Sequence, residues 1–178
     1  MNSHTALLVI DMQVGIADEA YDEDRAILTC IAGLLAQARE QGTPVIFIQH
    51  DGEPGDSLEP YAAGWPIHAM IAPREGETVI RKRASDSFYE TPLHETLQAR
   101  GIQRLIVTGA ATQFCVDATC RRAASLNYDV VLVADGHLAA DNNILKAAQV
   151  VAHHNVTLAH MAHPTHPIQV VAAKDVEF

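Results

Sequence analysis

Three side chains with complementary chemistry follow apolar stretches that lie far apart in the chain. Asp11 follows the run "TALLVI", Lys82 ends "TVIRK", and Cys115 comes shortly after "RLIVTG". Together they could perform nucleophilic catalysis, because a thiolate attacks carbonyl carbon while a carboxyl group moves protons. Each also has a simpler interpretation. Cys115 could be a packing residue, Asp11 a helix cap, and Lys82, within "RKR", a solvated surface charge.

Alternating strand and helix patterns could bring these three side chains together. Apolar runs predict strands at Thr5–Asp11, Pro44–His50, Thr78–Lys82, Arg104–Gly109, Asp129–Asp135 and Asn155–His160. Helical spacing of apolar residues and capping signals predict helices at Asp24–Gln41, from Thr91-Pro92 to Gly101, at Phe114–Leu126 and at Asn142–His153.

Continuous apolar strands between amphipathic helices are typical of a parallel sheet covered on both faces. We therefore expect an α/β fold, a single doubly wound domain over residues 1–178 with a mainly parallel sheet and helices on both faces. The tail after Pro164 could form a short extra strand or a subunit contact. Ligands of such sheets bind beyond the carboxyl ends of the strands, where Asp11, Lys82 and the loop carrying Cys115 would meet.

Composition and charge narrow the class of partner. The chain is 48% apolar and carries a formal net charge of −10, so a general nucleic-acid binder is excluded for want of a basic surface. No apolar run is long enough for a bilayer and no secretory leader is evident. Three cysteines fit a reducing compartment better than a disulfide framework. We expect a cytoplasmic protein that acts on a small molecule and binds neither membrane nor nucleic acid.

The position expected for Cys115 predicts a reactive thiol. In the first turn of a helix, unpaired N–H groups and the positive end of the dipole favour a thiolate, and Lys82 would lower the thiol pKa further. Asp11, at the end of a buried strand, is partly desolvated, which raises its pKa and suits it to proton transfer. Cys30 and Cys120 are interpreted as packing residues.

The surrounding motifs resemble the isochorismatase-like cysteine hydrolases, the superfamily that includes nicotinamidases and N-carbamoylsarcosine amidases. The resemblance runs from about Thr5 to about His160 and rests on "LLVIDMQVGI", "VIRKRASDSFYETPL" and "GAATQFCVDATCRRAASLNYDVVLVADG". It implies Cys115 as nucleophile, Asp11 as acid and base, and Lys82 as the third member of a triad. It also implies a cis peptide bond between Ala110 and Ala111, and an oxyanion hole formed by the N–H groups of Ala111 and Cys115.

By the same resemblance the protein would cleave a C–N bond of amide type in a small molecule through a thioester, as a dimer or larger homo-oligomer. Isochorismatases that cleave a vinyl ether lack the cysteine, so Cys115 disfavours that chemistry. Three alternatives remain: a metal-assisted nicotinamidase, a catalytically silent binding or scaffold protein of the same fold, and a thiol redox protein. The redox alternative lacks a resolving cysteine on the same helical face, since Cys120 lies about 140° round the helix from Cys115.

A metal is not expected. Metal-binding nicotinamidases have an Asp, a His two residues later and a second His, whereas this chain offers Asp51 and His68 with Glu53 at the intermediate position. Asp51 and His68 are therefore only weak metal candidates, and no cofactor is predicted. The five histidines after residue 150 are interpreted as surface residues.

The substrate pocket is less clearly marked than the triad. The loop Asp51–Glu77 is long enough to form a wall or lid, because loops of this length in compact domains are usually functional. Trp65 and Phe88 could offer ring faces to a planar substrate, although both could equally be core or interface residues. The complete set of substrate-binding candidates is Gln13, Trp65, Phe88, Thr112 and Gln113.

Overall fold

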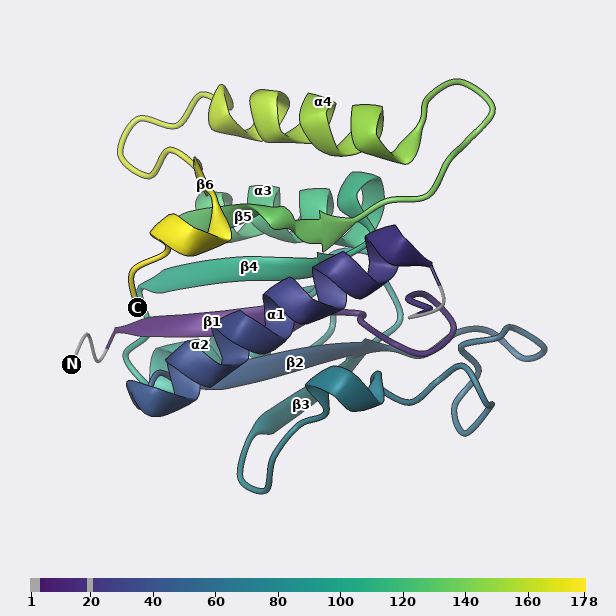
Figure 1. Ribbon diagram of the computed structural model, residues 1–178. Helices are drawn as coiled ribbons and strands as arrows, with labels where there is room; N and C mark the ends of the chain where they lie inside the picture. The colour runs from purple at the N-terminus through teal and green to yellow at the C-terminus, as the bar shows by residue number, and fades with distance from the viewer. Residues whose placement is uncertain (1–3, 19–20) are drawn as a thin grey trace.

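The computed structural model describes residues 4–18 and 21–178 (Figure 1). Six parallel strands form one sheet in the order β3-β2-β1-β4-β5-β6. The strands are β1 (Thr5–Ile10), β2 (Val45–His50), β3 (Thr78–Lys82), β4 (Arg104–Ala110), β5 (Asp129–Leu138) and β6 (Gln169–Val171). From β1 the chain adds strands toward one edge of the sheet as far as β3, and from β4 it adds strands toward the other edge. The topological switch point therefore lies between β1 and β4, which is where doubly wound sheets bind ligands.

Helices cover both faces of the sheet, as expected for an α/β fold. α1 (Asp22–Glu40) crosses one face of the sheet (Figure 1), and its buried leucines and isoleucines join one core cluster with β1, β2 and β5. α2 (Leu93–Ala99) and α3 (Asp117–Ser125) bury residues in a second cluster, which Leu158 of α4 (Ala147–Ala159) also joins. All described strands share one sheet, and the two hydrophobic clusters lie on its two faces. The single domain over residues 1–178 stays a prediction, because residues 1–3 and 19–20 lie outside the described part.

The central strands are predicted well because they are buried on both faces and therefore read as unbroken apolar runs. β1 ends one residue earlier than predicted and β3 matches, while β4 and β5 extend further, to Ala110 and Leu138. The helix predicted to start at Thr91-Pro92 starts one residue later than this pair indicated. Pro92 is the N-cap of α2, and Thr91 Oγ1 accepts a hydrogen bond from Leu93 N at 3.3 Å.

The predictions for the C-terminal quarter were wrong in two places. The expected helix Asn142–His153 begins only at Ala147, because Asn142 Oδ1 accepts hydrogen bonds from the N–H groups of Ile144 and Leu145 and holds a turn there. The expected strand Asn155–His160 continues α4 to Ala159. Alternating apolar residues over so short a stretch also fit a helix, in which Leu158 is fully buried and Val156 is exposed.

The sixth strand, β6, comes instead from the tail after Pro164. For this tail the sequence left open a short extra strand or a subunit contact. Gln169–Val171 pairs in parallel with Val131–Val133 of β5. Beyond Val133, Asn155 of α4 reaches the adjoining part of β5, where its Nδ2 donates a hydrogen bond to Ala134 O at 3.0 Å. None of the helices in the described residues is long and apolar enough to cross a membrane.

Candidate active site

The three side chains singled out from the sequence lie in contact. Lys82 Nζ forms an ion pair with Asp11 Oδ2 at 2.7 Å, and it donates hydrogen bonds to Cys115 Sγ at 3.2 Å and to Ala84 O at 2.9 Å. The side chain of Lys82 is fully buried, which excludes its interpretation as a solvated surface charge. A carboxylate, an ammonium and a thiol therefore meet at the carboxyl edge of the sheet.

The end of β1 aims Asp11 by an unusual backbone conformation. Asp11 has φ 49°, while its N–H donates to Ile48 O of β2 at 2.9 Å. A non-glycine residue in this region carries a strain of order 1 kcal/mol, which the surrounding hydrogen bonds must offset. The same sheet edge requires Gly109 of β4, whose φ is 119° and whose added Cβ would lie 2.1 Å from Ile10 O. β1 and β4 can therefore approach closely just before Asp11 and Ala110.

Cys115 lies in a different local structure from the one predicted. A π-helical turn over Thr112–Val116 precedes α3, and Ala111 O accepts hydrogen bonds from Phe114 N and Val116 N. Cys115 is therefore in the wide turn before α3 rather than in the first turn of an α-helix. The peptide bond between Ala110 and Ala111 is cis. Wide turns of this kind are frequent at functional sites.

The thiol is not held as a thiolate in the resting site. Burial, and then the neighbouring Asp11 carboxylate, raise the pKa of Cys115 to about 11, against the lowering effect of Lys82. The expected depression of the thiol pKa was thus wrong, because desolvation and a like charge outweigh the ammonium. Burial also raises the pKa of Asp11, opposed by Lys82. The thiol therefore keeps its proton at neutral pH and lies beside a carboxylate able to accept it.

The long loop after β2 is fastened to the site by Gln13. This buried side chain donates to His50 O at 3.0 Å and to Trp65 O at 2.8 Å, and it accepts from His50 N. Trp65 Nε1 in turn donates to Asp51 Oδ1 at 2.9 Å, and the guanidinium of Arg81 lies 5.1 Å from the Trp65 ring centre. Gln13 thus positions the loop wall, and Trp65 remains a half-buried candidate for contact with substrate.

The remaining pocket candidates differ in position. Phe88 is in the core, where its ring stacks on Tyr128 with centres 6.0 Å apart, so its packing interpretation is favoured. Thr112 is buried and its hydroxyl lies 2.9 Å from Leu138 O and 2.8 Å from His137 Nδ1. It therefore fixes the start of the π-helical turn. Gln113 Oε1 is buried without a hydrogen-bond partner among the described residues, which leaves it available to a ligand.

Sequence reasoning gave no role to three residues that support the site. Ser87 N donates to Thr119 Oγ1 at 3.1 Å and the two hydroxyls are 2.8 Å apart, so the segment after Lys82 is tied to α3. The signal was present in the motif "DSF..T", where Ser87 stands beside Phe88. His50 pairs with Lys82 across β2 and β3, and burial, followed by the charge of Lys82, lowers its pKa.

The two weak metal candidates are engaged elsewhere. Asp51 forms an ion pair with Arg81 at 2.8 Å in addition to its bond from Trp65, and His68 Nδ1 accepts from Met70 N at 3.3 Å. Within residues 4–18 and 21–178 no group of three or more His, Cys, Asp or Glu side chains is placed to hold a metal ion. Because the guanidinium of Arg81 already neutralises Asp51, Asp51 and His68 do not fit a cation site.

Cavities flank the reacting groups on two sides. One of about 270 Å³ is lined by Lys82 together with Asp51, Arg81 and Tyr89. Another of about 500 Å³ has Ala110 and Ala111 in its wall, facing Ile16 and Ala139. Ala110 and Ala111, which flank the cis peptide bond, are therefore accessible to a small molecule.

The fold and this site define an α/β protein with a buried Asp–Lys–Cys constellation at the topological switch point. The isochorismatase domain model matches residues 5–168, and the chain belongs to the isochorismatase family. An isochorismatase structure from Pseudomonas putida KT2440 superposes with a TM-score of 0.88 at 30% identity, covering 98% of this chain and 91% of that one.

Two curated relatives have named activities. Streptothricin hydrolase of Streptomyces noursei is 38% identical over 138 residues, which cover 76% of this chain and 55% of the relative. Ureidoacrylate amidohydrolase RutB of Variovorax paradoxus is 31% identical over 171 residues, covering 75% of this chain and 68% of the relative. This chain thus spans about half the length of the streptothricin hydrolases that it matches.

Proposed function

We propose that this protein is a cysteine-dependent hydrolase that cleaves an amide-type C–N bond of a small molecule through a thioester. The observation that carries the proposal is the contact of Lys82 Nζ with both Asp11 Oδ2 and Cys115 Sγ in a buried site. The names of the two relatives, a streptothricin hydrolase and a ureidoacrylate amidohydrolase, agree with a reaction of this class.

Proton transfer starts the reaction. The Asp11 carboxylate accepts the proton of the Cys115 thiol as Sγ attacks the carbonyl carbon of the substrate. Because the pKa of the free thiol is raised to about 11, proton transfer to Asp11 and attack by Sγ occur together and the thiolate does not accumulate. The ammonium of Lys82 beside Sγ balances the negative charge that develops. Asp11 then returns the proton to the leaving nitrogen, and the amine departs. A water molecule, deprotonated by Asp11, hydrolyses the thioester and restores the thiol.

The negative charge that develops on the carbonyl oxygen needs donors. The N–H groups of Ala111 and Cys115, on either side of the start of the π-helical turn, would form the oxyanion hole. Loss of one such donor in other enzymes costs about 2.7–4 kcal/mol of transition-state stabilisation. Thr112 supports this segment through its hydrogen bond to Leu138 O. The proposal requires no metal or cofactor.

The test is release of ammonia or amine from a panel of small amides: nicotinamide, pyrazinamide, N-carbamoylsarcosine and ureido acids. Wild type is compared with Cys115→Ala, and Cys120→Ala serves as a matched control because that thiol lies in the core, outside the site. Turnover that is lost in Cys115→Ala and kept in Cys120→Ala supports the proposal. Turnover that survives in Cys115→Ala overturns it.

A further inference from the structure

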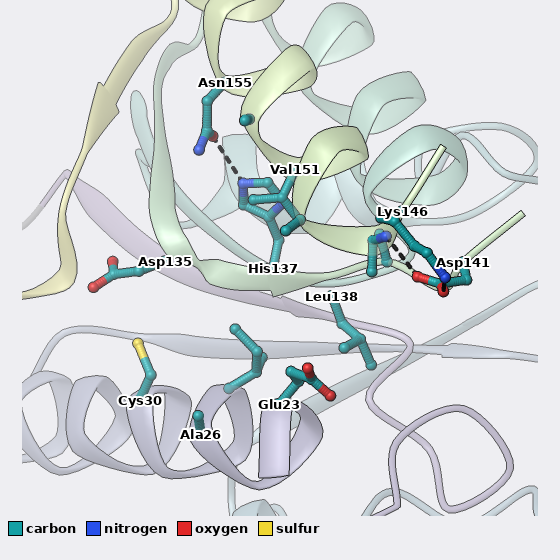
Figure 2. Close-up of a pocket in the computed structure, with 15 residues that line it drawn as sticks. Glu23, Ala26, Cys30, Asp135, His137, Leu138, Asp141, Lys146, Val151 and Asn155 are labelled. Atoms are coloured by element: carbon teal, nitrogen blue, oxygen red, sulfur yellow. Dashed lines mark hydrogen bonds and ion pairs between the residues drawn. The ribbon is translucent and has the colours of Figure 1, made fainter. Parts of the chain in front are cut away.

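A third and larger cavity lies beside the one that exposes the cis peptide bond. It has a volume of about 760 Å³ and is enclosed by α1, the end of β5 and α4. Figure 2 shows Ala26 and Cys30 on α1 facing Val151 and Asn155 on α4, with His137 of β5 between the helices. None of the roles assigned above to the Asp–Lys–Cys constellation uses this space.

This α1–α4 cavity adjoins the one that holds the cis peptide bond. Five residues line both: Glu23, Leu138, Ala139, Asp141 and Ala147. A molecule whose carbonyl group lies against Ala111 could therefore extend past Leu138 and Ala139 into the space between the helices. The larger cavity therefore lies next to the one that exposes the cis peptide bond.

The lining indicates the chemistry of an occupant. Its surface is mainly apolar, with alanines on α1, just after β5 and on α4, and the side chains of Ile27, Leu138 and Val151. The buried His137 is already engaged, since its Nε2 lies 2.9 Å from Oδ1 of the half-buried Asn155. What remains for the occupant is apolar contact, which favours a hydrocarbon body over a polar one.

The charged side chains of the cavity are mostly acidic. Glu23, Asp135 and Asp141 contribute carboxylates, and the one ammonium in the lining, that of Lys146, pairs with Asp141 at 2.6 Å. A carboxylate at the far end of a substrate would be repelled there, whereas an amine would be attracted. The acidic lining therefore favours a substrate with a terminal amine over one of equal length with a terminal carboxylate.

We propose that the α1–α4 cavity is the subsite for the non-reacting part of the substrate, and that this part is an apolar chain ending in an amine. This inference rests on the proposed amide hydrolysis and specifies its substrate class. Full burial of a methylene group corresponds to about fourfold in binding. Four added methylenes in a half-open cavity are therefore expected to raise kcat/KM by about tenfold or more.

The test compares acetamide, hexanamide, 6-aminohexanamide and the monoamide of adipic acid as substrates of the wild-type protein. We expect kcat/KM to rise from acetamide to hexanamide, and 6-aminohexanamide to exceed the adipic monoamide by about fivefold. Turnover of these amides with no dependence on chain length would overturn the subsite while leaving the proposed hydrolysis intact. A preference for the acid would overturn the charge argument.

Matched variants on α4 locate the effect. Ala152 and Ala159 are both exposed on α4, but Ala152 lines the α1–α4 cavity whereas Ala159 lines neither cavity. Ala152→Phe is expected to reduce the ratio of kcat/KM for hexanamide over acetamide to near one, and Ala159→Phe to leave that ratio unchanged. An unchanged ratio in Ala152→Phe contradicts the assignment.

Occupancy can also be measured without turnover, which separates failure of the subsite from failure of the reaction. Cys30 lines the cavity and is partly exposed, so its alkylation at pH 9 reports access. In Cys115→Ala protein, 6-aminohexanamide at ten times its Kd should slow alkylation of Cys30 about tenfold. Absence of protection overturns the inference even if no amide is hydrolysed. Protection that depends on protein concentration alone would assign the cavity to a second copy of the chain and likewise overturn it.

Discussion

Replacing Asp11 by Asn separates thiol reactivity from catalysis, because the same carboxylate does two opposite things. It raises the pKa of Cys115, and it accepts the thiol proton during attack. With a pKa of about 11, about one Cys115 in a thousand is ionised at pH 8. Removing a like charge in contact with the thiol is expected to increase that fraction about 100-fold. The resulting thiolate is less basic and about tenfold less nucleophilic, which leaves a net gain of about tenfold.

The assay is iodoacetamide labelling of Cys115 at pH 8, followed by site-resolved mass spectrometry. Asp11→Asn should be labelled about tenfold faster than wild type, yet it should hydrolyse no amide because the proton acceptor is gone. Asp51→Asn is the control, since that carboxylate lies at the same sheet edge but pairs with Arg81. Labelling that is unchanged or slower in Asp11→Asn would refute the account of the thiol pKa.

Three further outcomes follow from the structure. Lys82→Met leaves a buried carboxylate unpaired, so urea denaturation should show a loss of about 3–5 kcal/mol in the free energy of unfolding; a loss below about 1 kcal/mol would contradict the burial of this pair. Gly109→Ala should yield little folded protein by circular dichroism, because the added Cβ meets Ile10 O. Gly76→Ala, which also has a positive φ but open space around it, should cost only about 1 kcal/mol. Burial raises the pKa of Glu77, but hydrogen bonds from Arg39 and from Arg74 N outweigh it and lower the pKa. Because Glu77 is more acidic in the folded protein, its stabilisation is present above the unfolded value of about 4.5 and is lost as pH falls below it. Glu77→Gln should therefore lower the thermal midpoint at pH 7, and its difference from wild type should shrink as the pH falls through the lowered pKa of Glu77 in the folded protein.

The C-terminal segment illustrates where local sequence ceases to be informative. Whether Asn155–His160 is a strand or a helix cannot be decided by two apolar residues at alternate positions. The choice follows from contacts distant in sequence: α4 packs against α3 and β5, where Leu158 joins the core, while Gln169–Val171 pairs with β5. Similarly, Phe88 could be read as a pocket residue until Tyr128, forty positions away, is seen stacked on it.

The sequence by itself determined the parallel sheet, the family and the three residues that meet at its edge. Buried parallel strands are recorded directly as apolar runs, and residues that end such strands converge wherever the sheet forms. Only the tertiary structure decided the electrostatic state of the site. The pKa of Cys115 depends on how completely the fold buries the thiol, and on the distances of 2.7 Å from Lys82 Nζ to Asp11 Oδ2 and 3.2 Å from Lys82 Nζ to Cys115 Sγ. Solvent exclusion and charge separation are properties of packed atoms in three dimensions, and the linear order of residues does not encode them locally.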